Sequence, residues 1–127
     1  MSYARRLTVA VTTAADGSAT EYSDPVDYGL LSQIRYVKPG SGGFDNGSTI
    51  TITTEITGEN LWTQTGVNVS ATVAPRQATH GVDGAASLYA AGGTAAQDKI
   101  AIVNDKIKIV IANGGNTKNA TFHFLIV

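Results

Sequence analysis

Hydrophobic side chains alternate with polar ones, residue by residue, in several short stretches of this sequence. In 48–57, STITITTEIT, the hydrophobic residues Ile50, Ile52 and Ile56 alternate with threonines and a glutamate. In 106–112, KIKIVIA, isoleucine occupies every second position. Successive side chains of a strand point to opposite faces of a sheet, so each stretch has one apolar face. The alternation predicts half-buried β-strands.

The same pattern recurs along most of the chain, between turn signals. The predicted strands, about eight or nine in number, span 7–13, 19–23, 30–37, 48–57, 61–65, 67–73, 99–103, 106–112 and 120–127. Asp16-Gly17, between the first two, predicts a hairpin because glycine tolerates the positive φ of a tight turn. We therefore expect an all-β chain folded as an antiparallel β-sandwich. A jelly roll of about eight strands is favoured, and other Greek-key layouts remain open.

Two segments depart from this rhythm. Residues 75–98, PRQATHGVDGAASLYAAGGTAAQD, form a long excursion between strands, and excursions of this length are often functional. Within it, 85–91 is predicted to make one or two helical turns around Leu88, because a Gly-Gly pair follows. Residues 1–6 are interpreted as an N-terminal arm.

Length and charge restrict the class of protein further. The chain has 127 residues, which suits one domain, so we expect a single sandwich over 1–127. It has no cysteine for disulfides, and its apolar runs are too short to span a bilayer. Nine basic and ten acidic residues leave it nearly neutral, without the basic stripe that nucleic acid requires. Neither a membrane nor a nucleic acid is expected as a partner.

Residues that could perform chemistry are few and scattered. His80 and His123 have no evident third partner, and no catalytic motif surrounds either. Glu55 and Glu59 flank a tight turn, where two carboxylates are usually solvated. Asp45-Asn46-Gly47 lacks the other ligands of a calcium loop and is explained as a turn. We expect no enzymatic activity, no cofactor and no metal site.

A glycan-binding module is the alternative from another class. Small β-sandwiches bind sugars through exposed aromatic side chains, and Trp62, Tyr22, Tyr28 and Tyr36 are available. A sandwich also needs large side chains for its core, and this interpretation is preferred for Trp62. The alternative function is a receptor- or glycan-binding module of a phage head fibre or tail.

The general sequence resembles the capsid cement, or decoration, proteins of tailed bacteriophages. The resemblance is carried by APRQATHGVDGAASLYAAGGT at 74–94, by IANGGNTKNATFHF at 111–124, and by the opening RRLTVAVTTAADGSATEYS with LSQIRYVKPG. It implies a jelly roll that sits on the outside of the capsid, after assembly in the host cytoplasm, and braces neighbouring capsomers. The implied partners are the phage major capsid protein and further copies of the chain, with a dimer favoured over a trimer.

Candidate contact residues follow from this role and from the sequence pattern. The strand at 120–127 carries apolar side chains on both faces, so a neighbouring subunit is expected to cover its outer face. Aromatic residues and arginine are enriched at interfaces, although Leu88 and Tyr89 have the equal alternative of packing the excursion onto its own sandwich. The candidates are Arg5, Arg6, Arg76, His80, Leu88, Tyr89, Leu125 and Val127.

Overall fold

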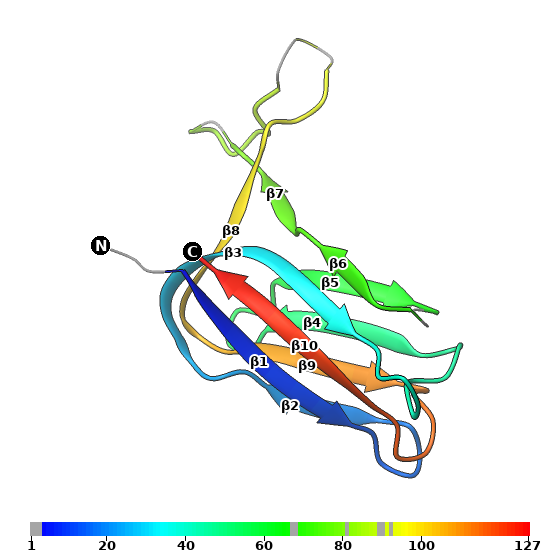
Figure 1. Ribbon diagram of the computed structural model, residues 1–127. Helices are drawn as coiled ribbons and strands as arrows, with labels where there is room; N and C mark the ends of the chain where they lie inside the picture. Colours follow the sequence, from blue (N-terminus) through cyan, green and yellow to red (C-terminus); the bar gives the residue numbers. More distant parts are fainter. Residues whose placement is uncertain (1–3, 67–68, 81, 89–90, 92) are drawn as a thin grey trace.

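The computed structural model consists of two facing antiparallel sheets, as the alternating sequence predicts (Figure 1). It describes residues 4–66, 69–80, 82–88, 91 and 93–127, and these residues include no helix. In chain order the strands are β1 Arg5–Thr12, β2 Ala19–Tyr22, β3 Val26–Val37, β4 Thr49–Thr54, β5 Asn60–Thr65, β6 Ala71–Val73, β7 Arg76–Ala78, β8 Gln97–Asp105, β9 Ile107–Ala112 and β10 Asn119–Ile126.

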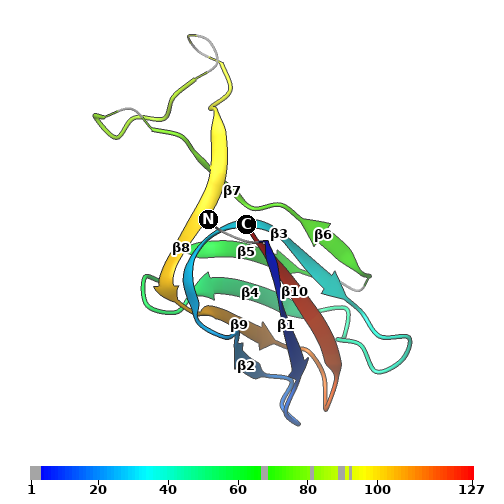
Figure 2. The same cartoon turned by 60° about the vertical axis from the view of Figure 1, so that its left-hand side comes forward.

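The strands pair in nested order, from the two ends of the chain inwards. β1 pairs with β10, β2 with β9, β3 with β8, and β4 with β5, always antiparallel. One sheet has the order β1-β10-β3-β8-β7, with β6 also paired to β3, and the other has the order β2-β9-β4-β5 (Figure 2). This nested pairing over two sheets is that of a jelly roll of eight strands, to which β6 and β7 are added.

The core lies between the two sheets and is supplied mainly by alternate residues of β1, β3, β4, β8, β9 and β10. On β10, Phe122 and Phe124 are fully buried, and on β3, Ile34 and Tyr36 are buried as well. Phe44 packs onto the core from its loop, with its ring centroid 6.1 Å from that of Tyr36. Removal of these faces from water is the main force that holds the sheets together.

The predicted hairpin at Asp16-Gly17 is wrong, although the turn itself is present. The N–H of Ala14 donates to the carbonyl of Ser18 over 2.8 Å, and Gly17 has a φ of +86°. The flanking strands then enter different sheets, β1 beside β10 and β2 beside β9. An Asp-Gly pair favours chain reversal, but the partners of the two strands are decided by segments near the other end of the chain.

Ile56 is not a core residue, contrary to the predicted alternation over 48–57. β4 ends at Thr54, and the side chain of Ile56 is 74% exposed in the turn that follows. The buried carboxylate of Asp105 holds this turn, because it accepts hydrogen bonds from the N–H groups of Ile56 at 2.9 Å and Thr57 at 3.4 Å. The turn therefore replaces the last part of the predicted strand.

The long excursion begins at a fork on β3. One edge of β3 is paired with β10, while the other edge is paired first with β8 and then with β6. After β6 the chain turns away from β3. β7 then pairs with the start of β8, with Arg76 opposite Lys99 and Ala78 opposite Gln97. We call residues 76–99 the arm. It stands away from the sandwich in both views (Figures 1 and 2).

The predicted helical turns at 85–91 are absent from the described part of the arm. Ala86 and Leu88 instead form isolated β-bridges with His80 and Ala95. Hydrogen bonds between separate segments pair the backbone N–H and C=O groups that a helix would have paired within one segment. The alanine-rich composition therefore did not decide the local structure.

Candidate interaction surfaces

The arm is held together by backbone hydrogen bonds and not by a core of its own. The N–H of Thr79 donates to the carbonyl of Ala96, that of Ala96 donates to Ser87, and that of Ser87 donates to Thr79, over 2.6–2.8 Å. None of the described side chains of the arm is buried. Segments 79–80, 86–88 and 95–96 thus form a small unit that stands apart from the sandwich core.

Apolar side chains are exposed on this unit. Val82 is fully exposed and Leu88 is 47% exposed. Asp83, next to Val82, is the one charged residue in the sequence from 82 to 97, so few charges would have to be buried with this surface against another protein. The arm is a candidate contact surface, as the length of the excursion suggested.

Arg76 lies at the base of the arm and is occupied within the chain. Its Nη1 atom donates to the carbonyl of Ser32 over 2.9 Å and to that of Pro75 over 2.8 Å. The register between β3 and β10 shifts at Ser32, because Leu125 is paired with Gln33 and the next residue, Ile126, is paired with Leu31. The guanidinium therefore fastens the arm to this irregular point of β3, and it is not simply a free contact residue.

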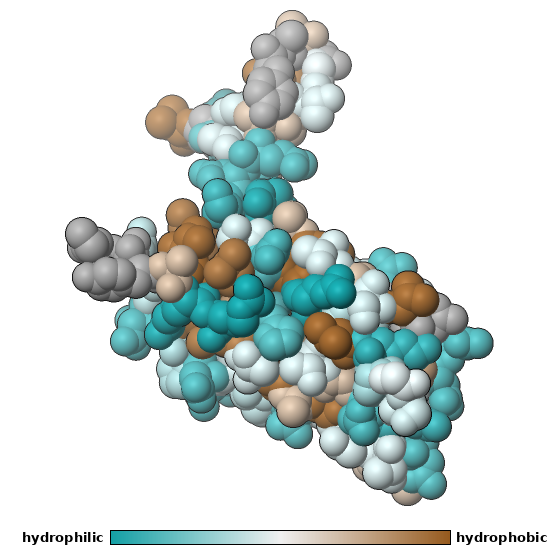
Figure 3. Space-filling view, in the orientation of Figure 1, coloured by the Kyte–Doolittle hydropathy of each residue, from teal (hydrophilic) through white to brown (hydrophobic). Residues whose placement is uncertain are grey.

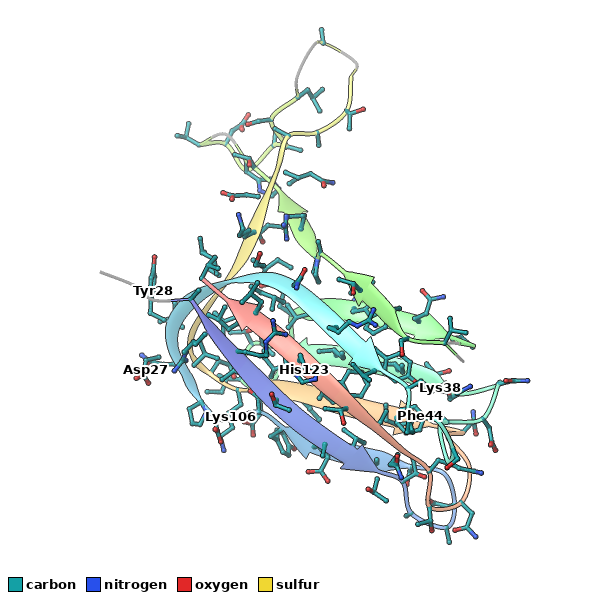
Figure 4. The ribbon with its side chains drawn as sticks, in the orientation of Figure 1. Asp27, Tyr28, Lys38, Phe44, Lys106 and His123 are labelled. Carbon is teal, nitrogen blue, oxygen red and sulfur yellow. The ribbon has the colours of Figure 1, made fainter. Side chains whose placement is uncertain are left out.

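The outer face of the six-stranded sheet, which points away from the second sheet, carries cross-strand rows of polar side chains. In one row, Thr8 Oγ1 lies 3.2 Å from His123 Nδ1, and Arg35 Nη1 donates to Thr72 Oγ1 over 3.0 Å. His123 points out of β10 on this face in Figure 4. These groups satisfy one another in pairs, as cross-strand neighbours commonly do.

One end of the same face is apolar. Tyr28 and Val103 are directly opposite each other on β3 and β8, and they are 63% and 54% exposed. In the adjoining row, Leu30 lies opposite Ala101, and Leu30 and Val127 exchange two backbone hydrogen bonds of 2.9 Å. We call these five residues the outer patch. Figure 3 shows hydrophobic side chains gathered at this end of the sandwich.

The predicted contact residues fall into two places. His80 and Leu88 lie on the arm, and Arg76 lies at its base. Arg5, Arg6, Leu125 and Val127 lie at the start of β1 and the end of β10, where Arg6 is opposite Leu125. Tyr89 lies outside the described residues. The structure thus brings the second group together at the outer patch, which includes Val127, and leaves the arm group apart from it.

Val82, Val103 and Ile56 are exposed apolar residues that the sequence pattern did not indicate, and Tyr28 was predicted only as a candidate for sugar binding. Val103 follows a regular alternation and precedes Asn104, whose φ is +48°. Residues other than glycine seldom have a positive φ, but asparagine adopts it more readily than most. The asparagine at position 104 is therefore the sequence feature that marks where β8 becomes irregular. Trp62 is half-buried and packs against the core, as preferred.

The two histidines lie on separate parts of the molecule. His80 lies on the arm, whereas His123 lies on β10. No group of three or more His, Asp or Glu side chains is placed to hold a metal ion in the part of the chain that the structure describes. Asp45-Asn46-Gly47 is a turn, in which the N–H of Ser48 donates to the carbonyl of Asp45. Within the same residues there is no helix that is long and apolar enough to cross a membrane.

Comparison with known proteins identifies no family. No protein-family model matches the sequence, and no curated protein is similar enough to it to establish a relationship. Among solved structures, the crystal structure of FLHE aligns with 98% of this chain and 96% of its own, at 9% sequence identity and a TM-score of 0.46. We draw nothing about function from a likeness this distant.

Proposed function

We propose that the chain is a non-enzymatic structural protein of a virion, which binds the outside of a tailed-phage capsid and braces neighbouring subunits of the major capsid protein. The sequence resemblance to capsid cement proteins suggests this role. The arm is the observation that supports it best, because it offers an exposed apolar surface at a distance from the sandwich core.

The arm is suited to gain stability from a neighbour. A two-stranded ribbon without a core is marginally stable in water. Packing Val82 and Leu88 against another protein would bury apolar area, at about 25 cal/mol per Å². The sandwich then acts as the scaffold, and the arm as the part that reaches an adjacent subunit.

Bracing follows from preferential binding. A protein that binds the assembled shell better than its free subunits stabilises the shell by mass action. Because many copies would bind one capsid, each contact can be modest. Under this proposal the chain needs no cofactor, and it is located on the exterior of the virion.

Reconstitution with capsids that lack the protein tests the proposal. The purified chain is added back, and its binding is measured by co-sedimentation, together with the temperature at which the particles release their DNA. We expect the wild-type chain to bind and to raise this temperature. The Val82→Glu/Leu88→Glu variant should lose binding, because charged side chains would be buried at the contact.

The control for this variant is Ile56→Glu, which adds a charge at an apolar residue that is 74% exposed on a turn outside the arm. It should bind as the wild-type chain does. Failure of the wild-type chain to bind, or to protect the particles, would refute the bracing role. Wild-type binding by the Val82→Glu/Leu88→Glu variant would show that the arm is not the contact surface.

A further inference from the structure

The outer patch is an exposed apolar surface on the rigid part of the molecule. Its residues come from three neighbouring strands, with Val127 after β10, Leu30 and Tyr28 on β3, and Ala101 and Val103 on β8. Tyr28 and Val103 are both more than half exposed. Contiguous apolar patches with a polar rim usually mark surfaces where proteins associate.

The charges at the two ends of the outer patch have opposite sign. At the β1 side, Arg6 is exposed and lies opposite Leu125, one row from Val127. At the other end, Asp27 is exposed and directly precedes Tyr28. Figure 4 shows Asp27 and Tyr28 pointing away from the sandwich at the same edge. The surface therefore runs from a cation, across an apolar centre, to an anion.

Such a surface is complementary to itself. A twofold axis places the same surface of a second copy against the first, with its two ends exchanged. The apolar centre then meets an apolar centre, and each Arg6 faces the Asp27 of the other copy. We propose that the outer patch is the surface through which two copies of this chain associate about a twofold axis.

The arm of the same chain is not the occupant of the outer patch, because it leads away from the sandwich in both ribbon views (Figures 1 and 2). A twofold pair leaves both arms available for other contacts. The association is independent of the proposed capsid-binding role, since that role depends on the arm and this one on the outer face of the sandwich.

Sedimentation velocity of the full chain, over concentrations up to about 100 μM, tests the association. The wild-type chain should sediment as a dimer at the upper concentrations. Val103→Glu and Tyr28→Ser should each raise the dissociation constant about tenfold or more, since they alter the apolar centre of the interface. Ile56→Glu is the matched control and should leave the constant unchanged. Thermal unfolding monitored by circular dichroism establishes that each variant is folded.

A charge exchange tests the twofold arrangement itself. Arg6→Asp and Asp27→Arg should each weaken the dimer, because each places like charges opposite one another. The double variant R6D/D27R should recover most of the wild-type association, and the recovery should decrease in high salt.

Three results would overturn the proposal. The first is that the wild-type chain remains monomeric at all concentrations. The second is that both patch variants associate as strongly as the wild-type chain. The third is that the double variant R6D/D27R associates as weakly as the single variants. The capsid experiment uses arm variants and a different readout, so its failure would be distinguishable from each of these results.

Discussion

The Cγ2 methyl group of Ile126 occupies the space that a side chain on Gly29 would need. Gly29 is buried on β3, and Ile126 is only 1% exposed near the end of β10. The two strands pack here at the point where their register shifts. Glycine is thus required at position 29 by close packing, and not by a turn.

Gly29→Ala should destabilise the fold by about 1–3 kcal/mol, because the added methyl group must displace a fully packed neighbour. Urea unfolding measures the change. Gly40→Ala is the control, since a Cβ at Gly40 meets no atom within 4 Å, and it should be nearly neutral. In an Ile126→Ala background the cost of Gly29→Ala should fall, and an undiminished cost would contradict the packing explanation.

Tyr36→Phe should stabilise the fold by up to about 1 kcal/mol. The Tyr36 hydroxyl is buried and has no hydrogen-bond partner among the described residues. Its removal therefore eliminates the free-energy cost of burying an unpaired polar group. The same burial raises the pKa of this hydroxyl. The ring contacts with Phe44 and Phe122 would be kept. The unfolding free energy in urea tests this, and a clear loss of stability would show that the hydroxyl is in fact paired.

Asp105→Asn should destabilise the protein by about 1–3 kcal/mol near neutral pH. Burial raises the pKa of the Asp105 carboxyl, but the surrounding backbone N–H groups, those of Ile56 and Lys106 first, lower it by more. Because the folded-state pKa lies below the unfolded value of about 3.9, the stabilisation is present above about pH 4. It is lost as the pH falls through the folded-state pKa.

The test of the Asp105 prediction is urea unfolding near pH 7 and in strong acid. The difference between wild type and Asp105→Asn should shrink in acid. Glu21→Gln, which removes an exposed carboxylate on β2, is the control and should stay within about 0.5 kcal/mol of wild type near pH 7. A difference for Asp105→Asn that is constant with pH would contradict the role of the carboxylate.

Thr117→Gly should raise the unfolding free energy by about 0.5–1 kcal/mol. Thr117 has a φ of +53°, in the left-handed region that is costly for a β-branched residue and free for glycine. Glycine also gains freedom in the unfolded chain, which offsets part of the relief. Thr20→Gly, on the exposed side of β2, should instead destabilise. Equal losses in the two variants would show that Thr117 is unstrained.

Much of the fold was predictable because alternation of side chains depends only on local sequence. The alternation correctly predicted the buried isoleucines of β4 and β9, which are Ile50, Ile52, Ile107, Ile109 and Ile111. The hairpin at Asp16-Gly17 and the helical turns around Leu88 were wrong, since in both cases distant segments supply the backbone partners. Ile56 was misplaced because the carboxylate that ends its strand lies far along the chain, at Asp105.

The contact surfaces were only half predictable, for a related reason. Leu125 stood out because its strand is apolar on both faces, which is visible in the sequence. Tyr28 and Val103 became neighbours only when β3 and β8 paired, across a separation that no local pattern reports. Nor does the sequence show that Arg76 is occupied by the carbonyl of Ser32.

The sequence by itself determined that this chain forms two-faced strands, because each residue's side of a strand follows from its position alone. Only the tertiary structure decided which strands meet, where the arm leaves the sandwich, and which apolar residues remain uncovered. Those outcomes depend on long-range pairing and packing, in which residues far apart in the chain compete for the same edges and the same space.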